Sequence, residues 1–229
     1  MWNGKKKAIT FSFDDGTLQD ARIIEILNKY GLKGTFNLCS GILGVPNTII
    51  RHDRPIDHSK VRAEDIGSIY AGHEVAVHTL THPWLNRLSD DDVVREIEED
   101  RLRLSELCGY EVYGMAYPFG VYDDRTLSLI RERTGVKYSR TIKNTHAFGV
   151  PSADDMLTWH PSVYYIEPEF ESVVDEFLAL ESDEAQLLYI CGHSFELDSD
   201  IKDATFDRIC TKLAGREDIF YGTNREVLG

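Results

Sequence analysis

Runs of apolar residues typical of buried strands alternate with amphipathic helical patterns along the whole chain, and this alternation restricts the possible folds. Expected strands are joined through helices or long loops and not through tight turns. Parallel strands require such crossover connections, whereas antiparallel strands can be joined by short hairpins. We therefore predict an α/β fold with a parallel sheet, either open or closed into a barrel. In both architectures the functional site lies at the carboxyl ends of the strands.

The expected elements cover most of the 229 residues without repeats or low-complexity linkers, so we predict one domain, residues 1–229. Strands are expected at 8–13, 34–38, 74–77, 112–116, 136–141, 163–166, 186–191 and 219–221. Helices are expected at 19–30, 63–71, 90–107, 123–133, 169–180 and 203–214. Residues 39–59 show no periodicity, and we expect a long loop that either shapes a binding cleft or is a surface insertion.

The composition excludes some classes of partner. The chain has 39 acidic and 25 basic residues and a net charge of −14, so nucleic acid and anionic membranes are not expected partners. Its four cysteines form no C-x-x-C pair, which is typical of buried thiols in a reducing compartment. No signal peptide or membrane span is visible, so we expect a cytoplasmic protein unless an export segment is missing from this sequence. The composition does not indicate an oligomeric state.

Two adjacent carboxylates close the first expected strand. In this strand Ile9, Phe11 and Phe13 alternate with small or polar residues, and Asp14 and Asp15 follow directly. Adjacent carboxylates repel each other, so the pair is either a solvated turn or a site where a cation or a shared proton offsets the repulsion. The following glycine allows the chain to bend sharply behind them.

Two histidines four residues apart follow the strand expected at 74–77. His78 and His82 have a spacing that is usual for two imidazoles binding one metal ion. The threonines between them and the following Pro83 favour a loop over a helix. Together with Asp15, they would form a set of two histidines and one carboxylate with an open position for water, the pattern of a catalytic zinc site.

Four short motifs now resemble, in order, those of the polysaccharide deacetylase family (carbohydrate esterase family 4). They are SFDDG at 12–16, HTLTH at 78–82, AYPFG at 116–120 and ICGHS at 190–194. The resemblance implies a distorted (β/α) barrel of about seven parallel strands, similar to a TIM barrel. It also implies a metal-dependent hydrolase that removes N-acetyl groups from an acetylated carbohydrate, either a glycan or an amino sugar.

The resemblance assigns roles to individual residues. It implies that Asp15, His78 and His82 bind one divalent ion, with Zn²⁺ expected first and Co²⁺, Ni²⁺ or Mn²⁺ as alternatives. It further implies that metal-bound water attacks the acetamide, with Asp14 as the general base and His193 as the general acid. The backbone N–H of Phe119 would help to hold the oxyanion. The other residues expected to line the substrate site are Tyr117, Pro118, Trp159 and Ile190.

The sequence departs from the family pattern in two places. Where many members have an arginine that supports the base, this chain has Ala116, and Arg140 is either its substitute from another strand or an ordinary ion-pair residue. Where the family has an aspartate that tunes the acid histidine, this chain has Thr158, so Asp155 or Glu196 would have to orient His193.

Two other functions remain alternatives to deacetylation. Hydrolysis of another C–N bond, in a cyclic imide or ureide, is known in relatives with the same fold and similar motifs. A carbohydrate-binding relative without catalysis is the second alternative. The intact pairs of aspartates and histidines favour the deacetylase.

Overall fold

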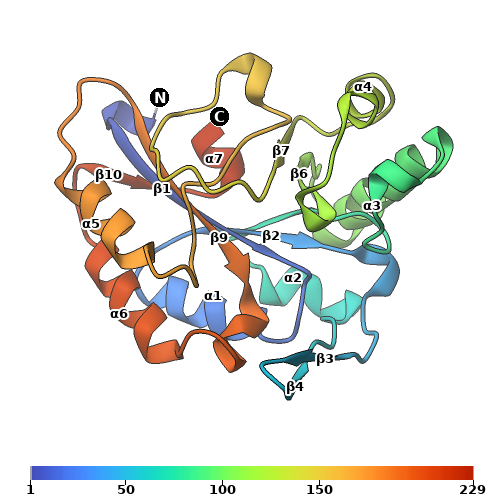
Figure 1. Ribbon diagram of the computed structural model, residues 1–229, viewed down its shortest axis with the longest axis horizontal. Coiled ribbons are helices and arrows are strands. Elements are labelled where there is room, and N and C mark those ends of the chain that lie inside the picture. The colour runs from blue at the N-terminus through green and yellow to red at the C-terminus, as the bar shows by residue number, and fades with distance from the viewer. Residues whose placement is uncertain (1, 229) are drawn as a thin grey trace.

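The computed structural model describes residues 2–228 and is built around an eight-stranded sheet in which neighbouring strands are parallel (Figure 1). The spatial order is β7-β6-β5-β2-β1-β9-β8, and β10 pairs with β1. The strands are β1 (Lys7–Asp14), β2 (Gly34–Leu38), β5 (Glu74–Val77), β6 (Gly114–Ala116), β7 (Tyr138–Arg140), β8 (Val163–Tyr164), β9 (Gln186–His193) and β10 (Ile219–Tyr221). The expected distorted barrel of about seven parallel strands is confirmed.

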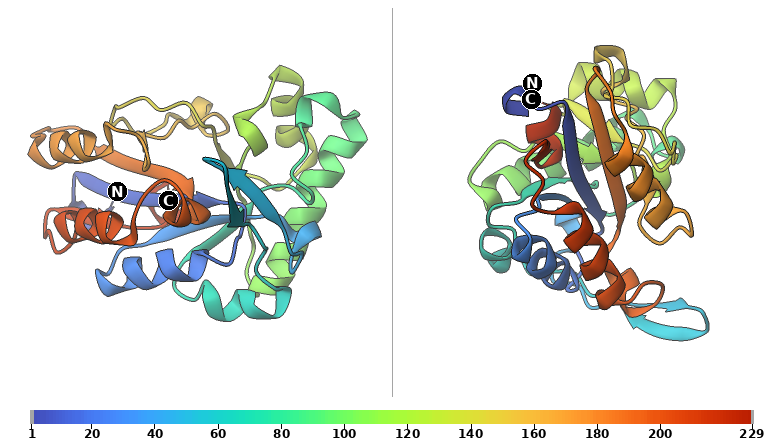
Figure 2. Two further views of the ribbon diagram at one scale, coloured as in Figure 1. Left: turned by 60° about the horizontal axis from the view of Figure 1, so that its bottom comes forward. Right: turned by 90° about the vertical axis from the view of Figure 1, so that its left-hand side faces the viewer.

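Helices α1 to α6 cover the outer face of this sheet, whereas the short α7 lies on its inner side, where Asn224 accepts from Thr10 (Figures 1 and 2). They are α1 (Asp20–Lys29), α2 (Ile66–Ile69), α3 (Asp90–Cys108), α4 (Asp124–Arg133), α5 (Phe170–Ala179), α6 (Asp203–Leu213) and α7 (Asn224–Leu228). The longest, α3, begins where the Ser89 hydroxyl accepts the N–H of Asp92 and ends at Gly109, whose φ is 71°. None of the helices between residues 2 and 228 combines the length and apolar character needed to cross a membrane.

The strand β1 lies at the centre of the sheet and determines which residues face one another. It pairs with β9 over its whole length, so that Asp14 stands opposite His193. On its other side, β10 pairs with residues 7–9 and β2 pairs with residues 11–14, where Asn37 is the partner of Asp14. The carboxyl ends of β1, β2 and β9 therefore meet at one place.

The two faces of the sheet are buried by different kinds of side chain. Ile9, Phe11 and Phe13 of β1 pack into the main apolar core between sheet and helices. The residues between them face inward, where hydroxyl, amide and carboxyl groups form hydrogen bonds. Thr10 donates to the amide oxygen of Asn224 at 3.0 Å. The interior is therefore a polar network in which most side chains are hydrogen-bonded, and this offsets the cost of burying them; Asn37 Oδ1 and Ser139 Oγ have no partner within residues 2–228.

The gap between β7 and β8 is spanned by a segment without regular strand structure. The N–H of Ser139 donates to the carbonyl of Met156 at 2.8 Å, and the N–H of Thr141 donates to that of Trp159 at 2.9 Å. A few residues later, the N–H of Ser162 donates to the carbonyl of Tyr189 in β9 at 2.8 Å. The segment 156–162 thus contacts both edges of the curled sheet, which makes the barrel distorted.

Two predictions from the sequence differ from the structure. The region 39–59 is not wholly irregular, because it contains the antiparallel strands β3 (Thr48–Arg51) and β4 (Arg54–Asp57). Their hairpin projects from the body of the molecule (Figure 2). Its turn residues, His52 and Asp53, have positive φ angles of 49° and 59°, a conformation that polarity patterns do not reveal. The short helix α7 was also not expected.

The buried Asp20 makes protein stability depend on pH. It accepts hydrogen bonds from Ser194 at 2.5 Å and Tyr70 at 2.6 Å, and burial raises its pKa from 3.8 to about 7. Because the folded-state pKa is above the unfolded value, the stabilising effect is complete below about pH 4 and is lost as pH rises through 7.

We predict that Asp20→Asn removes this dependence. Between pH 5 and pH 7.5 the free energy of unfolding of the wild type should fall relative to that of the variant by about 2 kcal/mol. Urea unfolding at both pH values measures the difference. Asp124→Asn, at an exposed first-turn acid of α4, is the control and should follow the wild type. Parallel curves for Asp20→Asn and wild type would contradict the prediction.

Candidate active site

The candidate residues from distant parts of the sequence meet at the carboxyl end of the sheet. Asp14 ends β1 and Asp15 follows it, while His78 and His82 lie in the loop after β5. His193 ends β9. These strands are close neighbours in the order β5-β2-β1-β9, so their carboxyl ends bring the side chains together.

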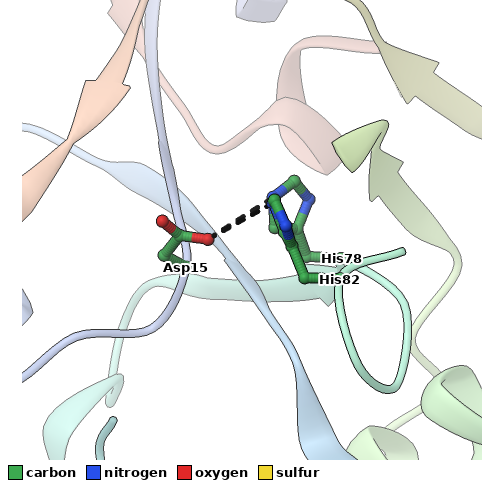
Figure 3. A group of neighbouring side chains, drawn as sticks. All are labelled: Asp15, His78 and His82. Atoms are coloured by element: carbon green, nitrogen blue, oxygen red, sulfur yellow. Dashed lines mark ion pairs between the residues drawn. The ribbon is translucent and has the colours of Figure 1, made fainter. Parts of the chain in front are cut away.

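Asp15, His78 and His82 form a compact group of potential metal ligands (Figure 3). The Oδ1 atom of Asp15 lies 3.8 Å from Nε2 of His78 and 3.6 Å from Nε2 of His82. One ligand atom from each residue lies within 4.8 Å of the others. His78 Nδ1 lies 2.8 Å from the carbonyl of Ala116, a contact that fixes the proton on Nδ1 and leaves Nε2 unprotonated. This donor set fits a divalent ion such as zinc.

The protonation states of this group also suit metal binding. Burial would raise the pKa of Asp15, but the hydrogen bond from His58 and the nearby cationic groups lower it well below its usual value. Burial, together with the neighbouring His78, lowers the pKa of His82 to about 4. At neutral pH the carboxylate is therefore ionised and the imidazole of His82 is neutral, and these are the forms that bind metal ions.

Backbone strain is concentrated around these ligands. Asp15, Thr79, His82 and Phe119 have φ angles of 80°, 67°, 61° and 57°, which are unfavourable for residues other than glycine. The hydroxyl of Thr79 accepts the N–H of His82 at 3.1 Å and helps to hold the turn. The histidines thus lie in a loop, as the sequence predicts, and the surrounding structure keeps the loop in a costly conformation.

The hairpin region supplies two further contacts to Asp15. His58, just after β4, places Nε2 3.0 Å from Oδ2 of Asp15, and the amine of the buried Lys60 lies 3.8 Å from Oδ1. Sequence reasoning left His58 without a role because the contact depends on how the hairpin folds back toward β1. The positive group at Lys60 offsets part of the repulsion between Asp14 and Asp15.

Asp14 is held by a buried ion pair with Arg140. The guanidinium of Arg140 donates to both oxygens of Asp14, and Asn37 donates to Oδ1 at 2.8 Å. Only 4% of Asp14 and 1% of Arg140 is exposed. Burial would raise the pKa of Asp14, but Arg140 and the nearby histidines lower it, so the carboxylate is ionised at neutral pH. Ala116 occupies the position where many family members have an arginine, and Arg140 is its register partner on the adjacent strand β7. The arginine that pairs with Asp14 therefore comes from the neighbouring strand.

His193 contacts groups on both sides of its ring. Its Nε2 lies 3.9 Å from Asp15 Oδ2, and its Nδ1 lies 2.5 Å from the hydroxyl of Tyr164. Glu196 accepts a hydrogen bond from the backbone N–H of His193 at 3.0 Å and another from the hydroxyl of Tyr164 at 2.6 Å. Burial would lower the pKa of His193, but Glu196, Asp15 and Asp14 raise it to about 9. Asp155, the other residue considered for orienting His193, accepts a hydrogen bond from Ser152 instead. The sequence analysis did not identify Tyr164.

The structure corrects three of the five residues expected to line the substrate site. Tyr117 is 1% exposed and donates to the carbonyl of Leu157. Ile190 faces the main core because successive side chains in β9 alternate between the faces, and His193 takes the other face. The ring of Trp159 stacks on that of Tyr189. Tyr189 precedes His193 by four residues in β9, so the two residues are separated by about 13 Å along the strand.

The other two expected residues follow β6 at the carboxyl end. Pro118 is buried, whereas Phe119 is 42% exposed. The ring of Phe119 lies 4.5 Å from that of His82 and 4.3 Å from that of Trp84, measured between centroids. Phe119 therefore borders the ligand group and supports the imidazole of His82 through ring contacts.

Comparison with known proteins agrees with this arrangement. The family model for polysaccharide deacetylase matches residues 2–139, which is more than half of the chain. The chain therefore belongs to the polysaccharide deacetylase family. The resemblance stated from the four motifs is confirmed.

Individual relatives are distant. The peptidoglycan-N-acetylmuramic acid deacetylase PdaC of Bacillus subtilis is 27% identical over 129 residues, which cover 55% of this chain and 24% of that protein. The chain spans less than half the length of the curated relatives it matches.

Solved structures share the fold at low sequence identity. A polysaccharide deacetylase candidate from Mycobacterium smegmatis has a TM-score of 0.69 at 19% identity, with 98% of this chain and 90% of that chain covered. A family 4 carbohydrate esterase pseudoenzyme from Bacillus anthracis has a TM-score of 0.56 at 18% identity, with 98% and 66% covered. Because one neighbour is a pseudoenzyme, the fold alone does not establish catalysis. Evidence for catalysis has to come from the residues of the site.

We predict that His82→Ala weakens metal binding because it removes one of three ligands. The wild type should bind one equivalent of Zn²⁺ in calorimetric titration. Removing a residue that only supports a ligand typically lowers metal affinity by about 10- to 100-fold. The loss of Zn²⁺ affinity in His82→Ala, which removes a ligand itself, should be larger. His146→Ala, at an exposed histidine that pairs with Glu167, is the control and should bind like the wild type. Absence of Zn²⁺ uptake by the wild type would contradict the assignment.

We also predict that Arg140→Met lowers the free energy of unfolding by about 3–5 kcal/mol, because it leaves Asp14 as an unpaired buried charge. The double variant with Asp14→Asn should be more stable than the sum of the single effects implies. Urea unfolding of the four proteins measures this coupling. Arg133→Met, which breaks the exposed pair with Asp91, should change stability by less than about 1 kcal/mol. An equally small effect of Arg140→Met would show that the buried pair is not needed.

Proposed function

We propose that this protein is a metal-dependent hydrolase that removes N-acetyl groups from a glycan or an amino sugar. The proposal rests mainly on the meeting of the Asp15, His78 and His82 group with Asp14 and His193 at one end of the barrel. Membership of the polysaccharide deacetylase family supports the substrate class. Deacetylation needs a base, an acid and a stabilised carbonyl oxygen, and the site offers a candidate for each.

When bound by Asp15, His78 and His82, a divalent ion lowers the pKa of water and polarises the acetyl carbonyl. Asp14 is the base in this proposal and takes the proton of the attacking water. Its ion pair with Arg140 keeps the carboxylate ionised and fixes its orientation. The water oxygen bonds to the carbonyl carbon while negative charge develops on the carbonyl oxygen.

His193, which stands opposite Asp14 on the neighbouring strand, is the proposed acid. Its pKa of about 9 means that the ring is an imidazolium at neutral pH, with a proton on Nε2 as well as on Nδ1. The proton on Nε2 goes to the nitrogen of the departing amine as the C–N bond breaks, so that acetate and a free amino group result. The N–H of Phe119 is the proposed donor to the carbonyl oxygen.

We predict that Asp14→Asn lowers kcat for acetate release by about 10²–10⁴-fold while Zn²⁺ binding is retained. The reason is that an amide cannot take the proton, whereas the three metal ligands are unchanged. Acetate is measured by an enzyme-coupled assay on N-acetylglucosamine and its oligomers, with folding checked by circular dichroism. Asp155→Asn, at an exposed acid that contacts Ser152, is the control and should keep full activity.

Three results would count against the proposal. Wild-type protein loaded with Zn²⁺ that releases no acetate from any N-acetylated sugar would contradict it. Ring opening of cyclic imides without acetate release would assign the site to the other C–N hydrolase reaction. Unchanged activity in a folded Asp14→Asn protein would remove this residue as the base.

A further inference from the structure

We propose that Tyr164 is a positioning residue for His193. Together with Glu196 it holds the imidazole so that Nε2 faces the metal-binding residues. The inference rests on the proposed function, in which His193 is the general acid. It concerns a tyrosine that no sequence motif indicates and that joins the acid histidine to a buried carboxylate.

The directions of the hydrogen bonds follow from the chemistry of the three groups. As a carboxylate Glu196 can only accept, so the hydroxyl of Tyr164 donates to its Oε1 at 2.6 Å. The single hydroxyl proton is then used, and the tyrosine oxygen accepts from Nδ1 of His193 at 2.5 Å. One proton of the imidazole is therefore held on Nδ1, and in the imidazolium form the second proton is on Nε2, which lies on the side of Asp15, 3.9 Å from Oδ2.

The elements that carry these residues are held together by the sheet and by further bonds. Tyr164 belongs to β8 and is the register partner of Cys191, two residues before His193. Glu196 has 2% of its side chain exposed, accepts the N–H of His193 at 3.0 Å, and lies 3.9 Å from the guanidinium of Arg51. The hydrogen bond between Tyr164 and Glu196 is thus partly buried and held on several sides, which strengthens it.

A glycine makes this close packing possible. A Cβ atom on Gly192 would lie 2.1 Å from the ring of Tyr165 and 3.3 Å from Oε2 of Glu196. A larger residue would therefore move β9 away from Tyr165 and Glu196. The lack of space for a side chain explains why the residue before His193 is a glycine.

The same arrangement accounts for the threonine at 158. The family pattern places at this position an aspartate that tunes the acid histidine. Here Thr158 is partly buried, and its hydroxyl donates to the carbonyl of Asp155 at 3.4 Å. Tyr164 and Glu196 approach His193 from β8 and from the turn after β9 instead. A carboxylate is thus still connected to Nδ1 from another part of the chain: the phenol, at 2.5 Å, is the closer partner of Nδ1, and Oε1 of Glu196 itself lies 3.5 Å away.

A matched control lies next to Tyr164 in the sequence. The hydroxyl of Tyr165 donates at 2.7 Å to the backbone carbonyl of His193 and does not contact the imidazole. Tyr164→Phe and Tyr165→Phe each remove one hydroxyl that contacts His193, from a partly buried residue in the first case and a buried one in the second. Only the first substitution removes the hydrogen bond to the ring, so a general loss of packing would affect both variants alike.

The test uses the full chain and two measurements. The first is kcat and KM for acetate release by Zn²⁺-loaded protein. The second is the nuclear magnetic resonance signal of the hydrogen-bonded Nδ1 proton of His193 in metal-free protein, assigned by its loss in His193→Gln. We expect Tyr164→Phe to lose this signal and to lower kcat by about 10- to 100-fold with KM little changed. Tyr165→Phe should retain both the signal and kcat.

Glu196→Gln provides a second variant in case Tyr164→Phe does not fold. It retains an acceptor for the tyrosine but removes the negative charge, and we expect a kcat below those of the wild type and Tyr165→Phe; a kcat equal to theirs would overturn the inference. The inference is overturned if Tyr164→Phe and Tyr165→Phe have the same kcat, or if the Nδ1 signal persists in Tyr164→Phe. If the wild type releases no acetate, the proposed function fails, and the persistence or loss of the Nδ1 signal still decides the hydrogen bond.

Discussion

The parallel register of β1 with its neighbours is the constraint on which the site depends. A shift of one residue between β1 and β9 would remove Asp14 from its place opposite His193 and would turn alternate side chains to the wrong face. The register is determined by the apolar side of β1, since Phe11 and Phe13 must lie against the helices. Packing on one face of the sheet therefore positions chemical groups on the other.

This arrangement requires polar groups to be buried on the inner face of the sheet. Asp14 and Arg140 are removed from water, and burial of two charges stabilises a protein only when they are paired and further hydrogen-bonded. The structure meets the condition, because Asn37 also donates to Asp14 and the carbonyl of Thr141 accepts from Arg140. Below this pair, hydrogen bonds among inward-facing side chains continue along the barrel. The polar interior gives the carboxylate of Asp14 a fixed geometry at the end of the barrel.

Both departures from the family pattern have a counterpart in space. Ala116 leaves the usual arginine position empty of charge, and Arg140 reaches Asp14 from the neighbouring strand at the same register level. Thr158 supplies no carboxylate, and Glu196 approaches His193 through Tyr164. Because the strands of a barrel converge, side chains from different strands can reach one atom. A role can therefore move along the sequence while its position in space is kept.

The sequence by itself determined the α/β class, most of the strands and helices, and the residues of the metal-ligand group. It could do so because apolar periodicity and the spacing of His78 and His82 are local properties. Alternation in β9 also predicts that Ile190 and His193 face opposite sides, although the expected site did not use it. The hairpin at 48–57 was missed because its turn depends on backbone angles that polarity does not encode.

Only the tertiary structure decided which distant groups support the reactive ones. Arg140 meets Asp14 across the barrel, His58 reaches Asp15 through the hairpin, and Tyr164 contacts His193 across a strand pair. Each contact joins residues that are far apart in sequence, so no local pattern marks it. Its existence follows from strand order, register and the curl of the sheet, which are properties of the whole folded chain.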